Sequence, residues 1–198
     1  DVNGTVKATA FEGDGSALTG ISAGLVNLGT TNVSAASTIT VTLSSTYKKF
    51  FVTVAGIKIA SESNLHPNLR VGVGGSIRTD SQYVFQGFQY RGDGNQVITN
   101  DMVNLNRTSV ATLGDDCLTT SSTANWNAQF EIDTGTSSSF PIINYNTFFN
   151  SGQNGSHNGV ASGRVFYAEK LIIDRIQLTT SSGANWAADG SVTVWGLK

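Results

Sequence analysis

Apolar and polar residues alternate with a period of two along much of the chain. Residues 38–43 alternate threonine with isoleucine, valine and leucine, and residues 128–132 alternate apolar side chains with Gln and Glu. This alternation predicts strands with one buried face, because successive side chains of a strand point to opposite faces. Residues 48–59 form a denser apolar run, which predicts a central strand buried on both faces. Further strands are predicted at residues 69–73, 164–178 and 191–197.

The aromatic residues of segment 83–90 change phase within one short run. Tyr83 and Phe85 fall on one phase of the alternation, and Phe88 and Tyr90 fall on the other. The change occurs at Gly87, and a glycine inside a strand pattern is typical of an irregular pairing position. The pattern therefore predicts a β-bulge at this glycine.

The fold class follows from the number of strands and from what separates them. Clusters of Gly, Asn, Ser and Asp, the residues that supply turns, lie between the apolar runs. The pattern gives about eight short strands and no segment with a helical period, which predicts an all-β sandwich or jelly roll. We expect this domain to span residues 25–198.

Residues 1–24 have a different composition from the rest of the chain. They contain few sizeable apolar side chains, too few to close a core by themselves. We expect a short extended segment that is stabilised when several copies wrap together and bury these side chains between chains. The candidate contacts are Val6, Phe11, Leu18 and Ile21.

Composition and charge exclude several classes of partner. The 198 residues carry 12 Lys and Arg against 14 Asp and Glu, a formal net charge of −2. Such a balance provides no basic field for a phosphate backbone, so we expect no nucleic-acid binding. No apolar run approaches the roughly 20 residues that span a bilayer, so we expect no membrane insertion.

The chain offers little material for catalysis, so we expect a protein that is not an enzyme. Its two histidines, His66 and His157, lie in turn-rich segments, and the Gly-x-Ser-x-Gly motif of a nucleophile elbow is absent. A zinc site needs three or four His, Cys or carboxylate ligands, which two isolated histidines and one cysteine do not supply. We expect neither a metal nor a cofactor.

Residues 144–159 are the most suggestive candidate for ligand contact, because they combine aromatic and amide side chains and carry no charge. Aromatic rings can pack on the apolar face of a sugar while amides bind its hydroxyls. Alternatively, the aromatic residues belong to a core strand and residues 150–159 form a long hairpin loop. The candidate contacts are Tyr145, Asn146, Phe148, Phe149, Asn154 and His157.

One nine-residue segment occurs twice. Residues 118–126 read LTTSSTANW, and residues 178–186 read LTTSSGANW, with one difference. No wider self-similarity exists, which favours two equivalent strand–loop–strand corners that share turn chemistry. Alternatively, the loops present Trp126 and Trp186 as stacking platforms for sugar rings.

Three stretches resemble phage fibre proteins. Residues 6–21, VKATAFEGDGSALTGI, are similar to a motif that ends a trimeric tail-fibre shaft just before a globular head. Residues 43–50 and the closing residues 176–198, which end in GSVTVWGLK, resemble fibre and virion head domains. The resemblance implies a homotrimer, a jelly-roll-like head and a location on the surface of the virion.

Together, the residues and the resemblance favour a non-enzymatic virion fibre head. Residues 1–24 would form the shaft end or linker, and the head would attach the phage to host surface polysaccharide or another glycan. The alternative is a structural virion protein (a capsid decoration, head fibre or tail component) that binds other virion proteins. A sugar-cleaving tail enzyme is a third, less favoured hypothesis, because it would need two carboxylates about 5–10 Å apart in a groove.

Overall fold

The described part of the chain is built from β-strands alone. The computed structural model describes residues 24–60, 63–93, 96–114, 118–119, 124–150 and 158–197. The strands are β1 (Leu25–Asn32), β2 (Thr38–Thr42), β3 (Lys49–Ile57), β4 (Ser63–Leu65), β5 (Pro67–Val73), β6 (Ser76–Ile77), β7 (Tyr83–Asp93), β8 (Gln96–Thr108), β9 (Ala111–Thr112), β10 (Leu118–Thr119), β11 (Asn125–Asp133), β12 (Ile142–Asn150), β13 (Asn158–Tyr167), β14 (Arg175–Thr180) and β15 (Ser191–Leu197). No helix among these residues is long and apolar enough to cross a bilayer.

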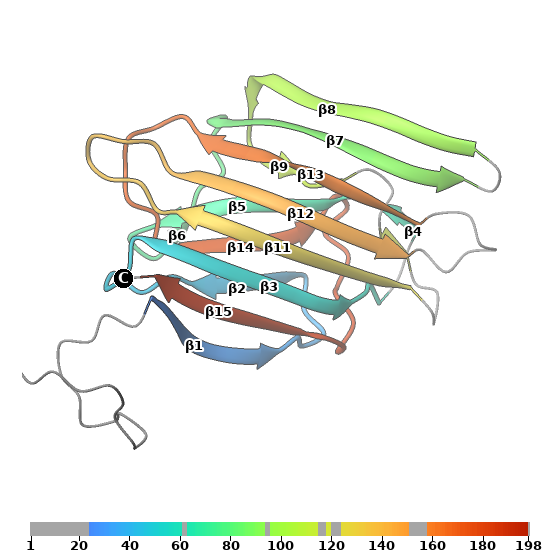
Figure 1. Cartoon of the computed structure of the whole chain (residues 1–198), viewed down its shortest axis with the longest axis horizontal. Helices are drawn as coiled ribbons and strands as arrows, with labels where there is room; N and C mark the ends of the chain where they lie inside the picture. The colour runs from blue at the N-terminus through green and yellow to red at the C-terminus, as the bar shows by residue number, and fades with distance from the viewer. Residues whose placement is uncertain are drawn as a thin grey trace, which may run out of the picture.

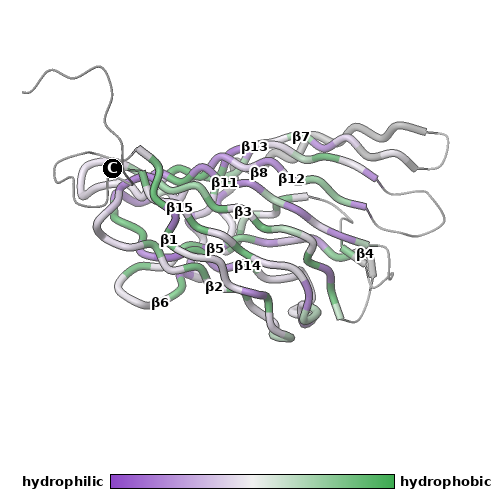
Figure 2. The backbone as a smooth tube through the Cα atoms, turned by 60° about the horizontal axis from the view of Figure 1, so that its bottom comes forward, coloured by the Kyte–Doolittle hydropathy of each residue, from purple (hydrophilic) through white to green (hydrophobic). Residues whose placement is uncertain are grey.

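Two antiparallel sheets of unequal size pack face to face, which confirms the predicted all-β sandwich. The larger sheet has eight strands in the order β1-β15-β3-β11-β12-β13-β7-β8, so β1 and β8 are its two edges (Figure 1). The smaller sheet has the order β2-β14-β5-β6, with β9 paired to β5. It lies below the larger sheet in Figure 2. A short pair, β10-β4, stands apart from both.

The core fills the space between the two sheets. In β11 and β12 alternate residues are buried, so the period-two pattern of the sequence is the burial pattern of the strands. The smaller sheet contributes the opposite layer of the core, and its fully buried side chains, each 0% exposed, are Leu69, Val71, Ile176 and Leu178. One apolar face of each sheet is therefore covered by the other, and the second face of each remains open to solvent.

Three details predicted from the sequence are wrong. Residues 164–178 do not form one strand, because β13 ends at Tyr167 in the larger sheet and β14 begins at Arg175 in the smaller one. Strand β3 is buried on one face only, because none of the described residues forms a third layer over the outer face of the larger sheet: Phe50 is 0% exposed and Phe51 is 38% exposed. There is also no bulge at Gly87, which pairs with Gly163 in a continuous β7–β13 register. The apparent change of phase arises because Phe88 and Tyr90 lie on the outer face while Tyr83 and Phe85 point inward.

A tyrosine joins the two sheets through hydrogen bonds. The hydroxyl of Tyr83, on β7, accepts a bond from the backbone N–H of Val71 on β5 at 2.9 Å and donates one to the carbonyl of Arg78 at 2.9 Å. Its ring packs edge-to-face on Tyr167, with centroids 5.1 Å apart, and the Tyr167 hydroxyl donates to Asp80. Burial raises the pKa of Tyr83 to about 12, and it also raises the pKa of Tyr167.

The predicted trimer contacts Val6, Phe11, Leu18 and Ile21 lie outside the described residues, as does all of the N-terminal segment except Gly24. Strand β1 begins directly after this segment. The strands of the sandwich lie between Leu25 and Leu197.

Candidate ligand-binding surface

The outer face of the larger sheet carries exposed aromatic side chains on neighbouring strands. Phe148 on β12 is opposite Val160 on β13, and Val160 is opposite Tyr90 on β7, so the three lie in one row across the sheet. Phe148 is 49% exposed and Tyr90 is 48% exposed. Phe88, 42% exposed, packs edge-to-face on Tyr90 with ring centroids 5.4 Å apart. We call Phe88, Tyr90 and Phe148, together with the Val160 that lies between Tyr90 and Phe148, the aromatic stripe.

A groove with a volume of about 680 Å³ adjoins the stripe on the same three strands. Phe88 lies at the boundary and belongs to both features. The other residues that line the groove are polar, aromatic or glycine, together with the positively charged Arg164, and none of them is acidic. They are Gln86, Gly87, Asn144, Tyr145, Asn146, Ser162, Gly163, Arg164 and Phe166.

Two glycines allow the strands beneath this groove to lie close to a buried tyrosine. Gly87 and Gly163 pair across β7 and β13, and Tyr145 of β12 pairs with Gly163. A Cβ atom on Gly87 would lie 2.6 Å from the Tyr145 hydroxyl, and one on Gly163 would lie 2.7 Å from it. Both contacts are far shorter than real Cβ contacts, so the strands can pair here only because both positions lack a side chain.

Hydrogen bonds hold the polar side chains of the groove in position. Ser162 Oγ donates to Asn146 Oδ1 at 2.6 Å, and Arg164 Nε donates to Asn144 Oδ1 at 2.6 Å. The Arg164 guanidinium also lies over the ring of Phe166, 5.7 Å from its centroid. Because each asparagine accepts through its oxygen, its NH₂ group remains a potential hydrogen-bond donor. The surface thus offers fixed donors beside exposed rings.

Charged side chains gather on the other side of Asn144. A small hollow of about 150 Å³ is lined by Lys49, Glu131, Asp133, Ile142, Asn144 and Arg164. Glu131 of β11 is opposite Asn144, and Asn144 is opposite Arg164, so the three form one row. Strand β12 therefore separates the acidic residues from the groove.

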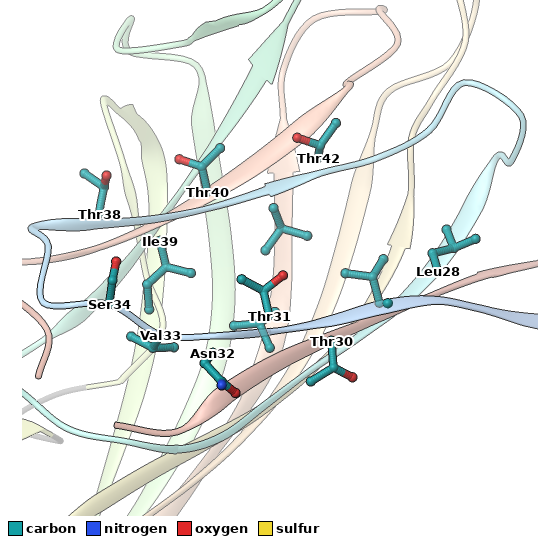
Figure 3. Close-up of a pocket in the computed structure, with 14 residues that line it drawn as sticks. Leu28, Thr30, Thr31, Asn32, Val33, Ser34, Thr38, Ile39, Thr40 and Thr42 are labelled. Carbon is teal, nitrogen blue, oxygen red and sulfur yellow. The ribbon is translucent and has the colours of Figure 1, made fainter. Parts of the chain in front are cut away.

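A second hollow lies where the two sheets meet at their edges. It has a volume of about 420 Å³ and opens between the edge strands β1 and β2. Ile39 points toward β1 and Thr31 toward β2 (Figure 3). Its apolar floor includes Val41 and Val192, and neither edge strand carries a charged residue.

The predicted contact residues fall into three groups. Asn146 and Phe148 lie on the exposed surface just described. Tyr145 and Phe149 alternate with them on the same strand and are buried, 1% and 4% exposed, so their side chains point into the core. Asn154 and His157 lie outside the described residues. The core-strand alternative is therefore correct for the inward-facing residues and wrong for Phe148.

The interpretation of Trp126 and Trp186 as stacking platforms is wrong. Both are 0% exposed, and their rings stack on each other with centroids 6.3 Å apart and an interplanar angle of 29°. Trp126 lies in β11, whereas Trp186 follows β14 and forms an isolated bridge with Ile59. The repeated segment thus brings its two tryptophans together in the core, where large aromatic side chains bury the most apolar area.

The sequence-based candidates omitted Phe88, Tyr90, Ser162 and Arg164. The alternation in residues 83–90 could have predicted that Phe88 and Tyr90 are exposed, because they occupy the phase opposite to that of the buried Tyr83 and Phe85. Nothing local in the sequence indicates Ser162 or Arg164, because only the pairing of β13 between β12 and β7 places them in the groove.

The surface combines exposed aromatic rings with hydrogen-bonded amide and hydroxyl groups. Among the described residues, no group of three or more His, Cys, Asp or Glu side chains is placed to hold a metal ion. Comparison with models of known protein families gives no match, and comparison with curated proteins gives none either. The fold and the surface therefore define the class: a β-sandwich with an exposed aromatic and amide surface on its larger sheet.

Proposed function

We propose that this chain is the non-enzymatic head of a virion fibre and that it attaches a phage to host surface glycan through the outer face of its larger sheet. The observation that carries the proposal is the aromatic stripe beside a groove of fixed amide and hydroxyl groups. A sugar ring has an apolar face that packs on an aromatic ring, and hydroxyls at its rim that need hydrogen-bond partners. The stripe and the groove supply both on adjacent strands.

The rigidity of the surface favours binding. The stripe lies on three hydrogen-bonded strands instead of a loop, and the Ser162–Asn146 and Arg164–Asn144 bonds restrain the side chains before a ligand arrives. A surface ordered in advance loses less conformational entropy on binding. Exposed aromatic side chains in register also have no role in the core of this domain, so their exposure requires another explanation.

The viral role and the homotrimer are supported by the resemblance of residues 6–21 to a shaft end and of the closing strand to fibre heads. In a trimer, three copies of the surface would bind one glycan-covered cell. Weak sites would then gain avidity through high effective concentration, which explains how a shallow groove can be sufficient. Other partners would be the upstream fibre shaft and other virion proteins.

Binding to glycans is tested with the Phe148→Ala variant. Removing a stacking ring costs about 1 kcal/mol or more, so we expect an approximately 5-fold or greater loss of affinity per site for an oligosaccharide that the wild type binds. Phe140→Ala is the matched control, because Phe140 is 44% exposed and precedes β12 at the end remote from Phe148. Glycan arrays followed by calorimetry provide the measurement.

Equal losses in the two variants, or unchanged affinity in Phe148→Ala, would contradict the proposed surface. If the chain binds no glycan but binds another virion protein through the stripe, the structural alternative replaces the attachment role. The trimer is tested separately by light scattering. We expect a mass near three times 20.8 kDa, and a monomer for the full chain would refute the shaft-end interpretation of residues 1–24.

A further inference from the structure

We propose that the groove is selective for acidic saccharides and that Arg164 binds the sugar carboxylate. The inference rests on the proposed glycan-binding function and specifies the ligand class of the same site. The starting observation is the side chain of Arg164, which is exposed, is restrained by two contacts, and has no carboxylate partner among the residues that the structure describes.

Two contacts restrain the Arg164 guanidinium. Its Nε donates to Asn144 Oδ1 at 2.6 Å, and its face lies on Phe166 at 5.7 Å from the ring centroid. Both contacts use the inner part of the guanidinium and leave the terminal Nη groups as donors. In the described part of the chain, no carboxylate forms an ion pair with Arg164, whereas Arg175 pairs with Asp174 and Lys58 pairs with Asp189, each at 2.9 Å.

The free edge of the guanidinium fits a carboxylate better than it fits a hydroxyl. A planar guanidinium presents parallel N–H groups whose spacing matches the two oxygens of a carboxylate, and such charge-assisted pairs are about twice as strong as neutral hydrogen bonds. Since Asn144 and Phe166 already hold the side chain, little additional rotamer entropy is lost when the ligand binds. A neutral sugar would leave this edge without its best partner.

The distribution of charge determines from which side an anion can approach. The residues that line the groove on the β7 side of Arg164 are Gln86, Phe88 and Ser162, and none of these three is acidic. On the opposite side, beyond Asn144, Glu131 and Asp133 would repel an anion, with Lys49 offsetting part of that charge. The carboxylate would therefore enter from the β7 side, which is also the side of the aromatic stripe.

If the carboxylate enters from the β7 side, the rest of the sugar lies in the groove next to the aromatic stripe. With its carboxylate on Arg164, a sugar ring would extend toward Phe88, and its hydroxyls would lie near Ser162 and the Asn146 amide. Phe88 is two residues from Gln86, the cross-strand partner of Arg164. Two residues along a strand and one strand across correspond to about 7 Å and about 5 Å, distances that a single substituted sugar ring can bridge.

The experiment uses the full chain and a panel of acidic polysaccharides that includes polygalacturonate, alginate and a sialic acid polymer. Each is compared with its carboxyl-reduced, neutral counterpart. The variants are Arg164→Gln and the control Arg107→Gln, which removes the same charge from an exposed arginine that contacts Gln82 at 3.0 Å, away from the groove. Phe148→Ala reports on the stripe independently of charge.

We expect at least one acidic polymer to bind about 10-fold or more tightly than its reduced form, a preference that Arg164→Gln abolishes and Arg107→Gln retains. The preference should weaken as salt is added, because the guanidinium is exposed. If reduced and acidic forms bind equally and Phe148→Ala weakens both, the selectivity inference fails and the glycan-binding proposal stands. If the preference survives in Arg164→Gln, the role of this residue is refuted. If the wild type binds no polymer in either form, both proposals fail.

Discussion

The hydroxyl of Tyr83 provides a direct test of what joins the two sheets. Tyr83 is 0% exposed, and its hydroxyl lies between the Val71 N–H on β5 and the Arg78 carbonyl. Tyr83→Phe removes one oxygen and leaves the ring packed on Tyr167. The substitution therefore isolates the hydrogen bonds from the packing.

The magnitude follows from what remains after the substitution. The Val71 N–H stays in the core without its acceptor, and an orphaned buried donor costs about 1–3 kcal/mol. For a chain of this size, 1 kcal/mol lowers the melting temperature by about 2–4 °C. We thus expect Tyr83→Phe to melt about 2–12 °C below the wild type at neutral pH.

The effect should also depend on pH. The pKa of Tyr83 is raised to about 12, above the ordinary value near 10, because burial disfavours the phenolate. The stabilisation from the neutral hydroxyl is therefore fully present below about pH 10 and is lost as the pH rises through about 12. The difference in stability between the wild type and Tyr83→Phe should narrow over this interval.

Calorimetry and reversible urea unfolding at several pH values measure both effects. Tyr47→Phe is the matched control, because Tyr47 is half-buried and packs on Phe50, and its hydroxyl has no hydrogen bond among the described residues. We expect this control to change stability by less than about 0.5 kcal/mol. Equal melting temperatures for Tyr83→Phe and Tyr47→Phe, or a difference that does not vary above pH 10, would refute the reasoning.

Two further substitutions test the groove and the tryptophan pair. Gly163→Ala places a Cβ 2.7 Å from both Gly87 Cα and the Tyr145 hydroxyl, so we expect a loss of about 1–3 kcal/mol by urea unfolding. Gly92→Ala, whose Cβ would meet only the Asn158 carbonyl at 3.7 Å, should change little, and equal effects would contradict the close-approach argument. Trp186→Ala should cost about 3–5 kcal/mol, because it leaves a cavity beside Trp126. A loss below about 0.5 kcal/mol, typical of a surface ring, would mean that Trp186 is not buried.

The fold class could be predicted from the sequence because it depends on local periodicity. Alternation of threonine with β-branched residues in segment 38–43, and of apolar with polar residues in segment 128–132, became β2 and β11 with the expected inward faces. The burial of the aromatic residues in 83–90 and of Phe51 could not be assigned in the same way. The alternation within a strand shows that its two faces differ in polarity, but it does not show whether another layer of the protein covers the more polar face.

The binding surface was decided by tertiary structure. Residues 144–149 contain the aromatic and amide side chains that attract attention in the sequence, yet strand geometry divides them: Asn146 and Phe148 point out, and Tyr145 and Phe149 point in. Their partners Tyr90, Ser162 and Arg164 come from strands distant in sequence, brought together by the antiparallel register of β7, β13 and β12.

Tertiary structure also explains why Trp126 and Trp186 are not stacking platforms: strand pairing places both in the core, where they are 0% exposed. Local sequence determines which residues alternate and where the chain turns, because these depend on backbone preferences and neighbouring side chains. Which face is covered, and which residues meet across strands, depends on long-range pairing between segments as far apart as Thr30 and Thr193, which are separated by 163 positions. For this protein, the sequence alone determined an all-β sandwich, and only the tertiary structure placed Phe88, Tyr90, Phe148 and Arg164 on one exposed surface.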